Sequence, residues 1–332
     1  MIEVKSWARL HLGLLDSNGD QGRLYGSMGV AVDRPYLILQ AEKSEKMQVE
    51  GLDTERVGQY AQRFVQHFGL SGGARLKLLA SIPAHVGLGS GTQIALAVGT
   101  ALARLAGLKI DTREIALVMG RGVRSGIGIA TFQRGGFVVD GGHRILPDPT
   151  EPGAGSGRAA KMDPNSIPPV LFQHAVPRDW FFITAIPGTE KGFSGEAEDR
   201  AFRQLPSAPA SLAEKVSRLL LMKMLPALVE MDILSFGQAL TEIQCMVGDF
   251  FAAVQGGRYS NPLSGRIIDF ILQNGAAGAG QSSWGPAVYG VVGGKKAALW
   301  LFDAVKNFLA EQGGGAVFCM RAQNRGAQIR WI

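Results

Sequence analysis

Alternation of apolar and polar positions dominates the first part of the chain. This period-two pattern predicts strands over 2–9, 26–32, 37–41, 47–50, 74–82 and 135–142. Pro35 falls between two of these segments and is expected at a sheet edge or a turn. In 54–68 the apolar residues recur at helical spacing instead, which predicts a helix that ends at Gly69. Two more helices are expected over 94–106 and 112–121, the second with Asp111 as its N-cap.

The second part of the chain is richer in long apolar segments. Helices are predicted over 213–225, 233–251, 267–273 and 295–309, and strands over 180–186, 289–292 and 316–320. Pro226 is expected to separate the first two helices. A stretch rich in Pro, Gly and Ser at 148–169 is typical of a linker, which predicts domains at 1–150 and 151–332. Grouped strands and helices favour an α+β fold over a doubly wound sheet.

Composition narrows the class of partner. The chain has 332 residues, of which 46% are hydrophobic and 19% charged, as in globular proteins. A net charge of +6 suits an anionic small-molecule substrate. The sequence has no Lys/Arg block, so nucleic acid is not expected as a partner. Only Cys245 and Cys319 occur, and no run has transmembrane length, so we expect a cytoplasmic protein without a membrane partner.

A glycine-rich loop over 83–93 carries the clearest chemical signal. It follows a predicted strand and leads into a predicted helix. In this order, the free N–H groups at the helix N-terminus can bind an anion. The loop is neither a P-loop nor a dinucleotide fingerprint, because no Lys follows the glycines and Thr92 stands at the third glycine position. A plain glycine turn, capped by Ser90 or Thr92, is the structural alternative.

Two basic patches could serve the same ligand. Residues 9–16 bring Arg9, His11 and Asp16 close to one strand end, where they could hold a phosphate, a metal or a carboxylate. Residues 120–128 combine Arg121 and Arg124 with glycines and a serine, and arginine binds phosphate oxygens bidentately. The alternatives are a polar strand end with a salt bridge and a cationic helix C-terminus.

Two further patches are small-residue turns with polar groups. Residues 191–200 place Glu196 and other acids after a glycine turn, where they could hold Mg²⁺ or form the charged first turn of a helix. Residues 275–286 offer Gln281, Ser282 and Ser283 as donors, with Trp284 either stacking on an aromatic ligand or buried in the core. Hydrolase and zinc-enzyme motifs such as G-x-S-x-G, H-E-x-x-H and C-x-x-C are absent from the sequence.

Taken together, these motifs resemble the GHMP superfamily, which contains galactokinase, homoserine kinase and mevalonate kinase. Residues 83–92 match its central motif P-x-x-x-G-L-G-S-[SG]-[AT], and 275–280 resemble its C-terminal motif. The segments at 9–16, 120–128, 135–143 and 280–286 look more narrowly like the beta-ribofuranosylaminobenzene 5′-phosphate synthase family. The resemblance covers nearly the whole chain.

This resemblance implies a fold, a reaction and partners. The fold would have an N-terminal ribosomal-protein-like α/β domain and a C-terminal ferredoxin-like α+β domain. The reaction would be an early step of methanopterin biosynthesis: phosphoribosyl pyrophosphate and 4-aminobenzoate or 4-hydroxybenzoate would give a C-riboside 5′-phosphate, CO₂ and pyrophosphate. Mg²⁺ would accompany the pyrophosphate, and the family expectation is a homodimer.

An ATP-dependent small-molecule kinase of the same superfamily is the alternative. Several such kinases carry S-G-x-D after the central motif, with the Asp acting on the attacking hydroxyl. Here Ser125 and Gly126 are followed at that position by Gly128, which cannot act as a base. The departure weakens the kinase interpretation without excluding it, since some relatives phosphorylate without that Asp.

The predicted site residues follow from these motifs. The expected catalytic residues are Asp16, Ser125 and Glu196, and Ser90 is the expected metal ligand. Substrate and pyrophosphate binding is expected at Arg9, His11, Gly87, Leu88, Gly89, Ser90, Gly91, Thr92, Gln93, Arg121, Arg124, Gly126, Gln281, Ser282, Ser283 and Trp284.

Overall fold

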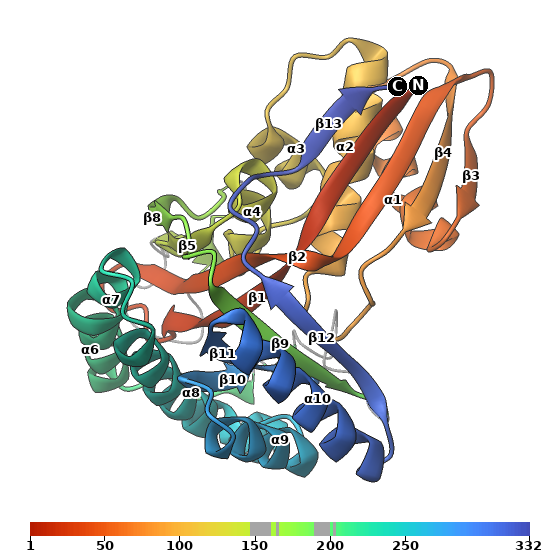
Figure 1. The fold of residues 1–332 in the computed structure, drawn as a ribbon. Coiled ribbons are helices and arrows are strands. Elements are labelled where there is room, and N and C mark those ends of the chain that lie inside the picture. Colours follow the sequence, from red (N-terminus) through yellow and green to blue (C-terminus); the bar gives the residue numbers. More distant parts are fainter. Residues whose placement is uncertain (147–160, 164–165, 189–199, 202–203) are drawn as a thin grey trace.

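The computed structural model describes residues 1–146, 161–163, 166–188, 200–201 and 204–332, and it shows two sheets with helices packed on them (Figure 1). The larger sheet has nine described strands and contains the path β13-β1-β2-β4-β3. Its members are β1 (Ile2–Asp16), β2 (Arg23–Ser44), β3 (Gln48–Gly51), β4 (Gly73–Ala80), β5 (Phe137–Asp140), β6 (His143–Leu146), β7 (Lys161–Met162), β8 (Val170–His174) and β13 (Gln328–Trp331).

Strand β2 is one long element, whereas the sequence predicted two strands separated near Pro35. The register explains the difference. Trp7 pairs with Tyr36, but Ala8 pairs with Val32, so residues 33–35 bulge out of the ladder between β1 and β2. Proline needs no ladder hydrogen bond at such a bulge, and the strand continues through it.

Four described helices pack with the larger sheet: α1 (Thr54–Phe68), α2 (Ser90–Ala106), α3 (Thr112–Val118) and α4 (Ile127–Arg134). The predicted bounds of α1 and its end at Gly69 are confirmed. Asp111 caps α3 as expected, since its side chain accepts a hydrogen bond from the Glu114 N–H. Helix α4 was not predicted, because the glycines around it mask its apolar face.

The smaller sheet is antiparallel, with the order β10-β11-β9-β12. Its strands are β9 (Trp180–Pro187), β10 (Gly278–Gln281), β11 (Val288–Gly293) and β12 (Gly315–Arg321). The helices of this half are α6 (Ala210–Leu219), α7 (Leu225–Val229), α8 (Ile233–Gln255), α9 (Pro262–Gln273) and α10 (Lys295–Glu311), with a π-helical turn at Leu220–Met224.

Pro226 does not separate two helices as predicted. The helix runs from α6 through the π-helical turn into α7, and Pro226 lies just after that turn. The regular hydrogen-bond pattern is already interrupted there, so a residue without an N–H is accommodated. The break comes at residues 230–232, and Asp232 then caps α8.

A hydrophobic cluster connects the two sheets, and the larger sheet includes strands that come late in the chain. Phe236 of α8 packs edge-on against Phe137 of β5 and contacts Trp180 of β9. Strands β8 and β13 both come after residue 150 but belong to the larger sheet, so sheet membership does not change at that residue. The division at residue 150 therefore stays a prediction.

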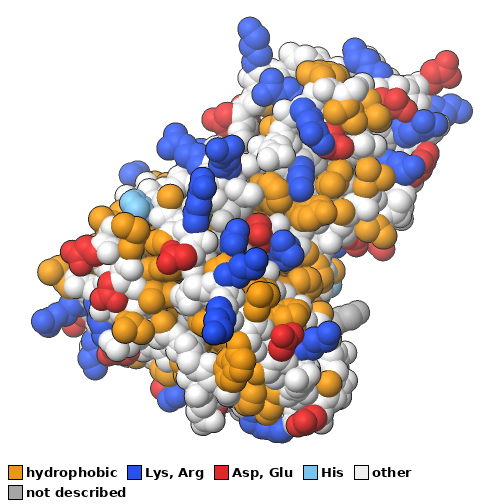
Figure 2. Space-filling model, viewed as in Figure 1, with side chains coloured by type: hydrophobic (Ala, Val, Ile, Leu, Met, Phe, Trp, Pro, Cys, Tyr) orange, Lys and Arg blue, Asp and Glu red, His pale blue; other side chains and the backbone are white. Residues whose placement is uncertain are grey.

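The molecular surface carries mixed charge. On the face shown in Figure 2, Lys and Arg side chains are spread over both halves, with acidic and hydrophobic side chains between them. On this face the basic residues do not form a single stripe. Among the described residues, no helix is both long and apolar enough to cross a lipid bilayer.

Candidate active site

The predicted glycine loop opens onto a cavity of about 510 Å³ between the two halves of the molecule. Gly87 (φ 88°) and Gly89 (φ 81°) take left-handed backbone conformations that favour glycine. A Cβ at Gly87 would collide with the carbonyl oxygen of Ser282, so only glycine lets the loop lie against that segment.

The helix N-terminus at this loop is open to a ligand. Helix α2 begins at Ser90, its N-cap is Gly89, and no side chain caps it. The first N–H groups of a helix have no partner within it, so those of α2 present partial positive charge at the cavity. Neither Ser90 nor Thr92 caps the helix, and the simple capped-turn alternative therefore does not describe this loop.

Three guanidinium groups surround this helix N-terminus. Arg9 of β1 donates from Nη1 to the Gly87 carbonyl at 2.5 Å. Arg121 lies 3.3 Å from the Thr92 Oγ1 through its Nη2. The third is Arg56 of α1, whose Nη1 lies 3.3 Å from the Ser90 Oγ and whose Nη2 lies 2.8 Å from the Asp53 carboxylate.

Arg56 is a cavity-lining residue that the sequence did not reveal. It lies in an ordinary amphipathic helix without a motif, and only the tertiary fold carries it to the loop. The one available signal was the Asp53–Arg56 spacing at the start of the predicted helix, which is also typical of a surface ion pair.

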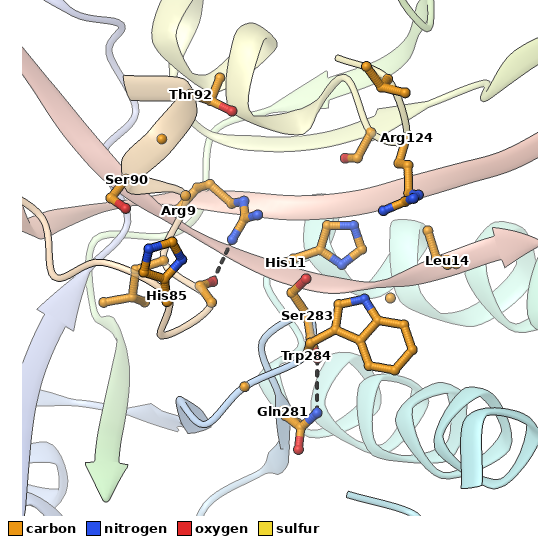
Figure 3. Close-up of a pocket in the computed structure, with 18 of the residues that line it drawn as sticks. Arg9, His11, Leu14, His85, Ser90, Thr92, Arg124, Gln281, Ser283 and Trp284 are labelled. Carbon is orange, nitrogen blue, oxygen red and sulfur yellow. Dashed lines mark hydrogen bonds between the residues drawn. The ribbon is translucent and has the colours of Figure 1, made fainter. Parts of the chain in front are cut away.

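The opposite side of the cavity is apolar and aromatic. Trp284 is 7% exposed and packs edge-on against Phe251 of α8, with ring centroids 5.1 Å apart. Leu14 and Val247 line the same region. Figure 3 shows Trp284 on the side of His11 away from Thr92. Trp284 forms a small hydrophobic cluster with Leu14 and Phe251, so this side of the cavity is apolar where the loop side is cationic.

The segment around Trp284 is fixed by polar contacts. Gln281 donates from Nε2 to the Ser283 carbonyl and accepts from the Ser260 N–H, at 2.9 and 2.8 Å. The Ser282 hydroxyl donates to the Gly87 carbonyl at 2.7 Å and accepts from the His11 N–H at 2.9 Å. Ser282 therefore ties the glycine loop to β1 from behind the cavity wall.

Ser125 reaches the cavity at the end of a buried hydrogen-bond chain. Its hydroxyl lies 2.7 Å from that of Ser27, which donates to the Asp140 carboxylate at 2.5 Å. Because Ser27 uses its proton on Asp140, Ser125 donates to Ser27 and presents an acceptor to the cavity. Burial raises the pKa of Asp140, while hydrogen bonds from Ser27, Gly126 and Gly142 oppose that shift.

His11 and Arg124 project into the same space (Figure 3). Burial, and after it the charge of Arg9, lowers the pKa of His11 to about 3, so its ring is neutral at pH 7. His85 also lines the cavity, on the loop itself, at a positive φ of 59°.

Most of the predicted binding residues line this cavity. The structure brings together Arg9, His11, Gly87, Leu88, Gly89, Ser90, Gly91, Thr92, Arg121, Arg124, Ser125, Gln281, Ser283 and Trp284. Three predicted binding residues and the predicted catalytic residue Asp16 do not line it. Gln93 donates to the Gly128 carbonyl, Gly126 donates to Asp140, and Ser282 ties the loop to β1.

The predicted acids find no support as ligands within the described residues. Asp16 is the fourth residue outside the cavity lining, and its carboxylate accepts from the N–H groups of Asn18 and Gly19 at the turn after β1. Glu196 lies outside the described residues. The described lining contains no carboxylate, and no group of three metal-ligating side chains occurs in the described part of the chain.

These described residues do not fit a protein-held Mg²⁺ site. Hard cations prefer carboxylate and carbonyl oxygens, but the hydroxyl of Ser90 faces the guanidinium of Arg56. The same surroundings favour an anion.

Comparisons with known proteins identify relatives of the chain. The family model for the N-terminal domain of GHMP kinases matches residues 55–136, and that for their C-terminal domain matches 224–311. The beta-ribofuranosylphenol 5′-phosphate synthase of Methanothermobacter thermautotrophicus is 37% identical, covering 98% of this chain and 97% of its own. The enzyme of that name from Archaeoglobus fulgidus is 35% identical, with 99% of each chain covered.

Solved structures show the same fold. Mevalonate pyrophosphate decarboxylase from Streptococcus pyogenes superimposes with a TM-score of 0.67 at 13% identity, covering 98% of this chain and 97% of its own. The predicted GHMP-kinase-like fold is thereby confirmed.

Proposed function

The chain belongs to the family of beta-ribofuranosylphenol 5′-phosphate synthases, and from this we propose that it joins phosphoribosyl pyrophosphate to a 4-substituted benzoate. The products would be a C-riboside 5′-phosphate, CO₂ and pyrophosphate. The relatives are named for a phenol product, which 4-hydroxybenzoate would give, so we place it before 4-aminobenzoate as the aromatic substrate.

One observation carries the proposal: a single cavity has a cationic end and an aromatic end. Arg9, Arg56, Arg121 and the N-terminus of α2 form the first, and Trp284 with Phe251 forms the second. An anionic leaving group suits the first end, and a benzoate ring suits the second. The two substrates would meet between them.

The reaction needs charge placement and exclusion of water more than a protein nucleophile. The guanidinium groups and helix N–H groups would stabilise the negative charge that develops on the departing pyrophosphate. The electron pair of the breaking C1–O bond leaves with the pyrophosphate. The ring carbon that bears the carboxylate then bonds to C1, and loss of CO₂ returns an electron pair to the aromatic ring.

Mg²⁺ belongs to the proposal as a companion of the pyrophosphate. Ser90 is the predicted protein ligand, and the other ligands would be phosphate oxygens and water. Since the described residues do not fit a protein-held site, no step above depends on the metal.

The kinase alternative is less supported. In α4 the position of the kinase Asp is Gly128, where a Cβ would already come within 3.0 Å of the Thr92 side chain. The described cavity lining also offers no other carboxylate to activate an attacking hydroxyl.

A direct assay tests the proposal. The purified protein is incubated with Mg²⁺, phosphoribosyl pyrophosphate and carboxyl-labelled 4-hydroxybenzoate or 4-aminobenzoate, and labelled CO₂ is collected. We expect release with at least one of the two acids, and none without phosphoribosyl pyrophosphate. Formation of ADP from ATP with a small alcohol, and no CO₂ from either acid, would favour the kinase.

A homodimer and a cytoplasmic location complete the proposal. The first comes from the family resemblance, and the second comes from the composition and from the lack of a transmembrane-length run in the sequence. Light scattering coupled to size-exclusion chromatography tests the first, since a dimer has twice the mass of the 35.3 kDa chain.

A further inference from the structure

His11 is a buried polar side chain inside the proposed active site. It is 7% exposed and lines the cavity from the middle of β1. Arg9 precedes it by two residues, and residues two apart on a strand lie on one face about 6.6 Å apart. Arg9 touches the glycine loop, so His11 lies one such step from the loop towards Trp284 (Figure 3).

The imidazole ring of His11 lacks a hydrogen-bond partner in the described part of the chain. Its backbone N–H is bonded to Ser282, which fixes the strand but leaves both ring nitrogens unused. Because the ring lines the cavity, its nitrogens are available to a group bound there.

The chemistry of this ligand group follows from charge. Arg9 and Arg124 flank His11, and the burial that lowers its pKa keeps the ring neutral. The arginines match the anionic groups of the substrates, namely the phosphates and the carboxylate. A neutral imidazole, with one N–H and one free lone pair, instead matches a neutral hydroxyl.

We propose that the His11 ring accepts a hydrogen bond from the ribose 2-hydroxyl of phosphoribosyl pyrophosphate, beside the carbon where the new bond forms. This assignment rests on the proposed function. With the pyrophosphate at the loop and the benzoate against Trp284, the ribose spans the space between them, where His11 lies.

Under this assignment, the neutral state of the His11 ring favours the reaction. Positive charge develops at C1 as the pyrophosphate leaves, and an imidazolium beside it would oppose that charge. Hydrogen bonds to the 2-hydroxyl strengthen in such transition states of glycosyl transfer. His11 would hold the hydroxyl without gaining or losing a proton, so the electron and proton balance of the reaction is unchanged.

A four-way comparison tests the assignment. Wild type and His11→Phe, which keeps the bulk of the ring without its nitrogens, are each assayed with phosphoribosyl pyrophosphate and with its 2-deoxy analogue. We expect His11→Phe to lower kcat/KM for the ribosyl donor roughly 10- to 100-fold. With the 2-deoxy donor the two proteins should differ less than about threefold, since the hydrogen bond is then already missing.

His11→Asn provides a second variant if His11→Phe does not fold, as judged by thermal unfolding. His67→Asn, at an exposed histidine of α1, is the matched control and should behave as wild type with both donors. An equal loss with both donors would overturn the 2-hydroxyl assignment and leave the proposed function standing.

Calorimetric binding of the two donors separates this inference from the proposed function, because binding requires no turnover. If wild type released no CO₂, the proposed function would fail. The same four-way comparison of dissociation constants would still decide whether His11 recognises the 2-hydroxyl.

Discussion

At the scale of single residues, the polar groups of the site divide into those already hydrogen-bonded to protein and those available to a ligand. Gln281 and Ser282 are occupied by protein partners and shape the cavity wall. His11 and the N–H groups at the start of α2 remain for a ligand. Arg9, Arg56 and Arg121 lie around the helix N-terminus, where an anion would bind.

Arg56 supplies the first prediction. Arg56→Ala removes a guanidinium from the helix N-terminus, and charge-assisted hydrogen bonds are worth about 1.5–3 kcal/mol. We expect the dissociation constant for pyrophosphate, measured by calorimetry, to rise roughly 10- to 100-fold. Arg75→Ala, at an exposed arginine of β4, is the control and should leave binding unchanged. Equal affinities in Arg56→Ala and wild type would place the pyrophosphate elsewhere.

The lowered pKa of His11 makes stability depend on pH. In the unfolded chain the ring takes up a proton below its ordinary pKa of 6.5, but in the folded protein only near pH 3. The unfolded state therefore binds more protons between these values, and stability falls as the pH drops through this window, by up to about 1.4 kcal/mol per pH unit.

Chemical denaturation of wild type and His11→Asn between pH 7 and 4 measures this contribution. The variant should lose stability less steeply, whereas His67→Asn should follow wild type. Burial also lowers the pKa of His143, which reduces stability at low pH in every protein compared. The raised pKa of Asp140 has the opposite effect on stability, again in every protein compared. Parallel curves for wild type and His11→Asn would show that His11 does not titrate as described.

At the scale of elements, the glycine loop is held in place by its close approach to the backbone around Ser282. Gly87 lies against the Ser282 carbonyl, and the Ser282 hydroxyl in turn bonds the Gly87 carbonyl. The Ala287 N–H adds a bond to the Val86 carbonyl at 3.1 Å. The loop, the start of α2 and residues 282–287 are therefore joined by hydrogen bonds around the proposed anion site.

Gly87→Ala tests this close approach. Its Cβ would displace the loop from Ser282, so we expect pyrophosphate binding to weaken at least about tenfold. Gly22→Ala is a matched control, since Gly22 also has a positive φ of 75° but a Cβ there would meet no atom within 4 Å. That variant should lose about 1 kcal/mol of stability and keep wild-type binding. Similar binding losses in both variants would point to backbone strain alone.

The sequence predicted the elements whose signals are local. Helix α1 has a clear apolar face and a terminal glycine, and α3 has its Asp cap, so both were found. Most of the predicted binding residues line the cavity because glycines and arginines cluster in motifs, but lining residues of α8, such as Gln244, Val247 and Phe251, were not predicted. Arg56 and the Ser27–Asp140 chain were missed, since their proximity arises only from tertiary contacts.

Other misses have specific physical causes. Pro35 and Pro226 look like breaks, but each lies where the regular hydrogen-bond pattern is interrupted, by a bulge at Pro35 and by a π-helical turn before Pro226. The predicted final strand at 316–320 exists as β12, yet β13 follows it. Residues 328–331 alternate polar and apolar residues over only four exposed positions, which is too short a pattern to predict a strand.

At the scale of the whole molecule, the segment after β12 ties the two ends of the chain together. The Gln323 N–H donates to the Ala31 carbonyl, and the Gln323 carbonyl accepts from the Gly136 N–H. The Ala327 N–H donates to the Phe132 carbonyl. Strand β13 then pairs with β1, which places the N- and C-termini side by side (Figure 1). Stability of the larger sheet therefore depends on residues from both ends of the sequence.

Removing residues 322–332 should destabilise the protein by at least about 3 kcal/mol, since several backbone hydrogen bonds and one strand are lost together. Thermal unfolding measures this as a lower Tm. Arg330→Ala is the control: it removes only the ion pair between Arg330 and Glu3, which is worth about 0–1 kcal/mol. A truncated protein with the Tm of wild type would show that β13 adds nothing to the fold.

The pairing of Ile2 with Trp331 also sets an order of events during protein synthesis. Strand β1 leaves the ribosome early, and β2 can cover one of its edges soon afterwards. Its other edge stays open until Gln328–Trp331 have been translated. An open strand edge is a template for pairing with another chain. On a polysome, neighbouring nascent copies would each expose this same edge, so slow translation before residue 328 would favour aggregation over completion of the sheet.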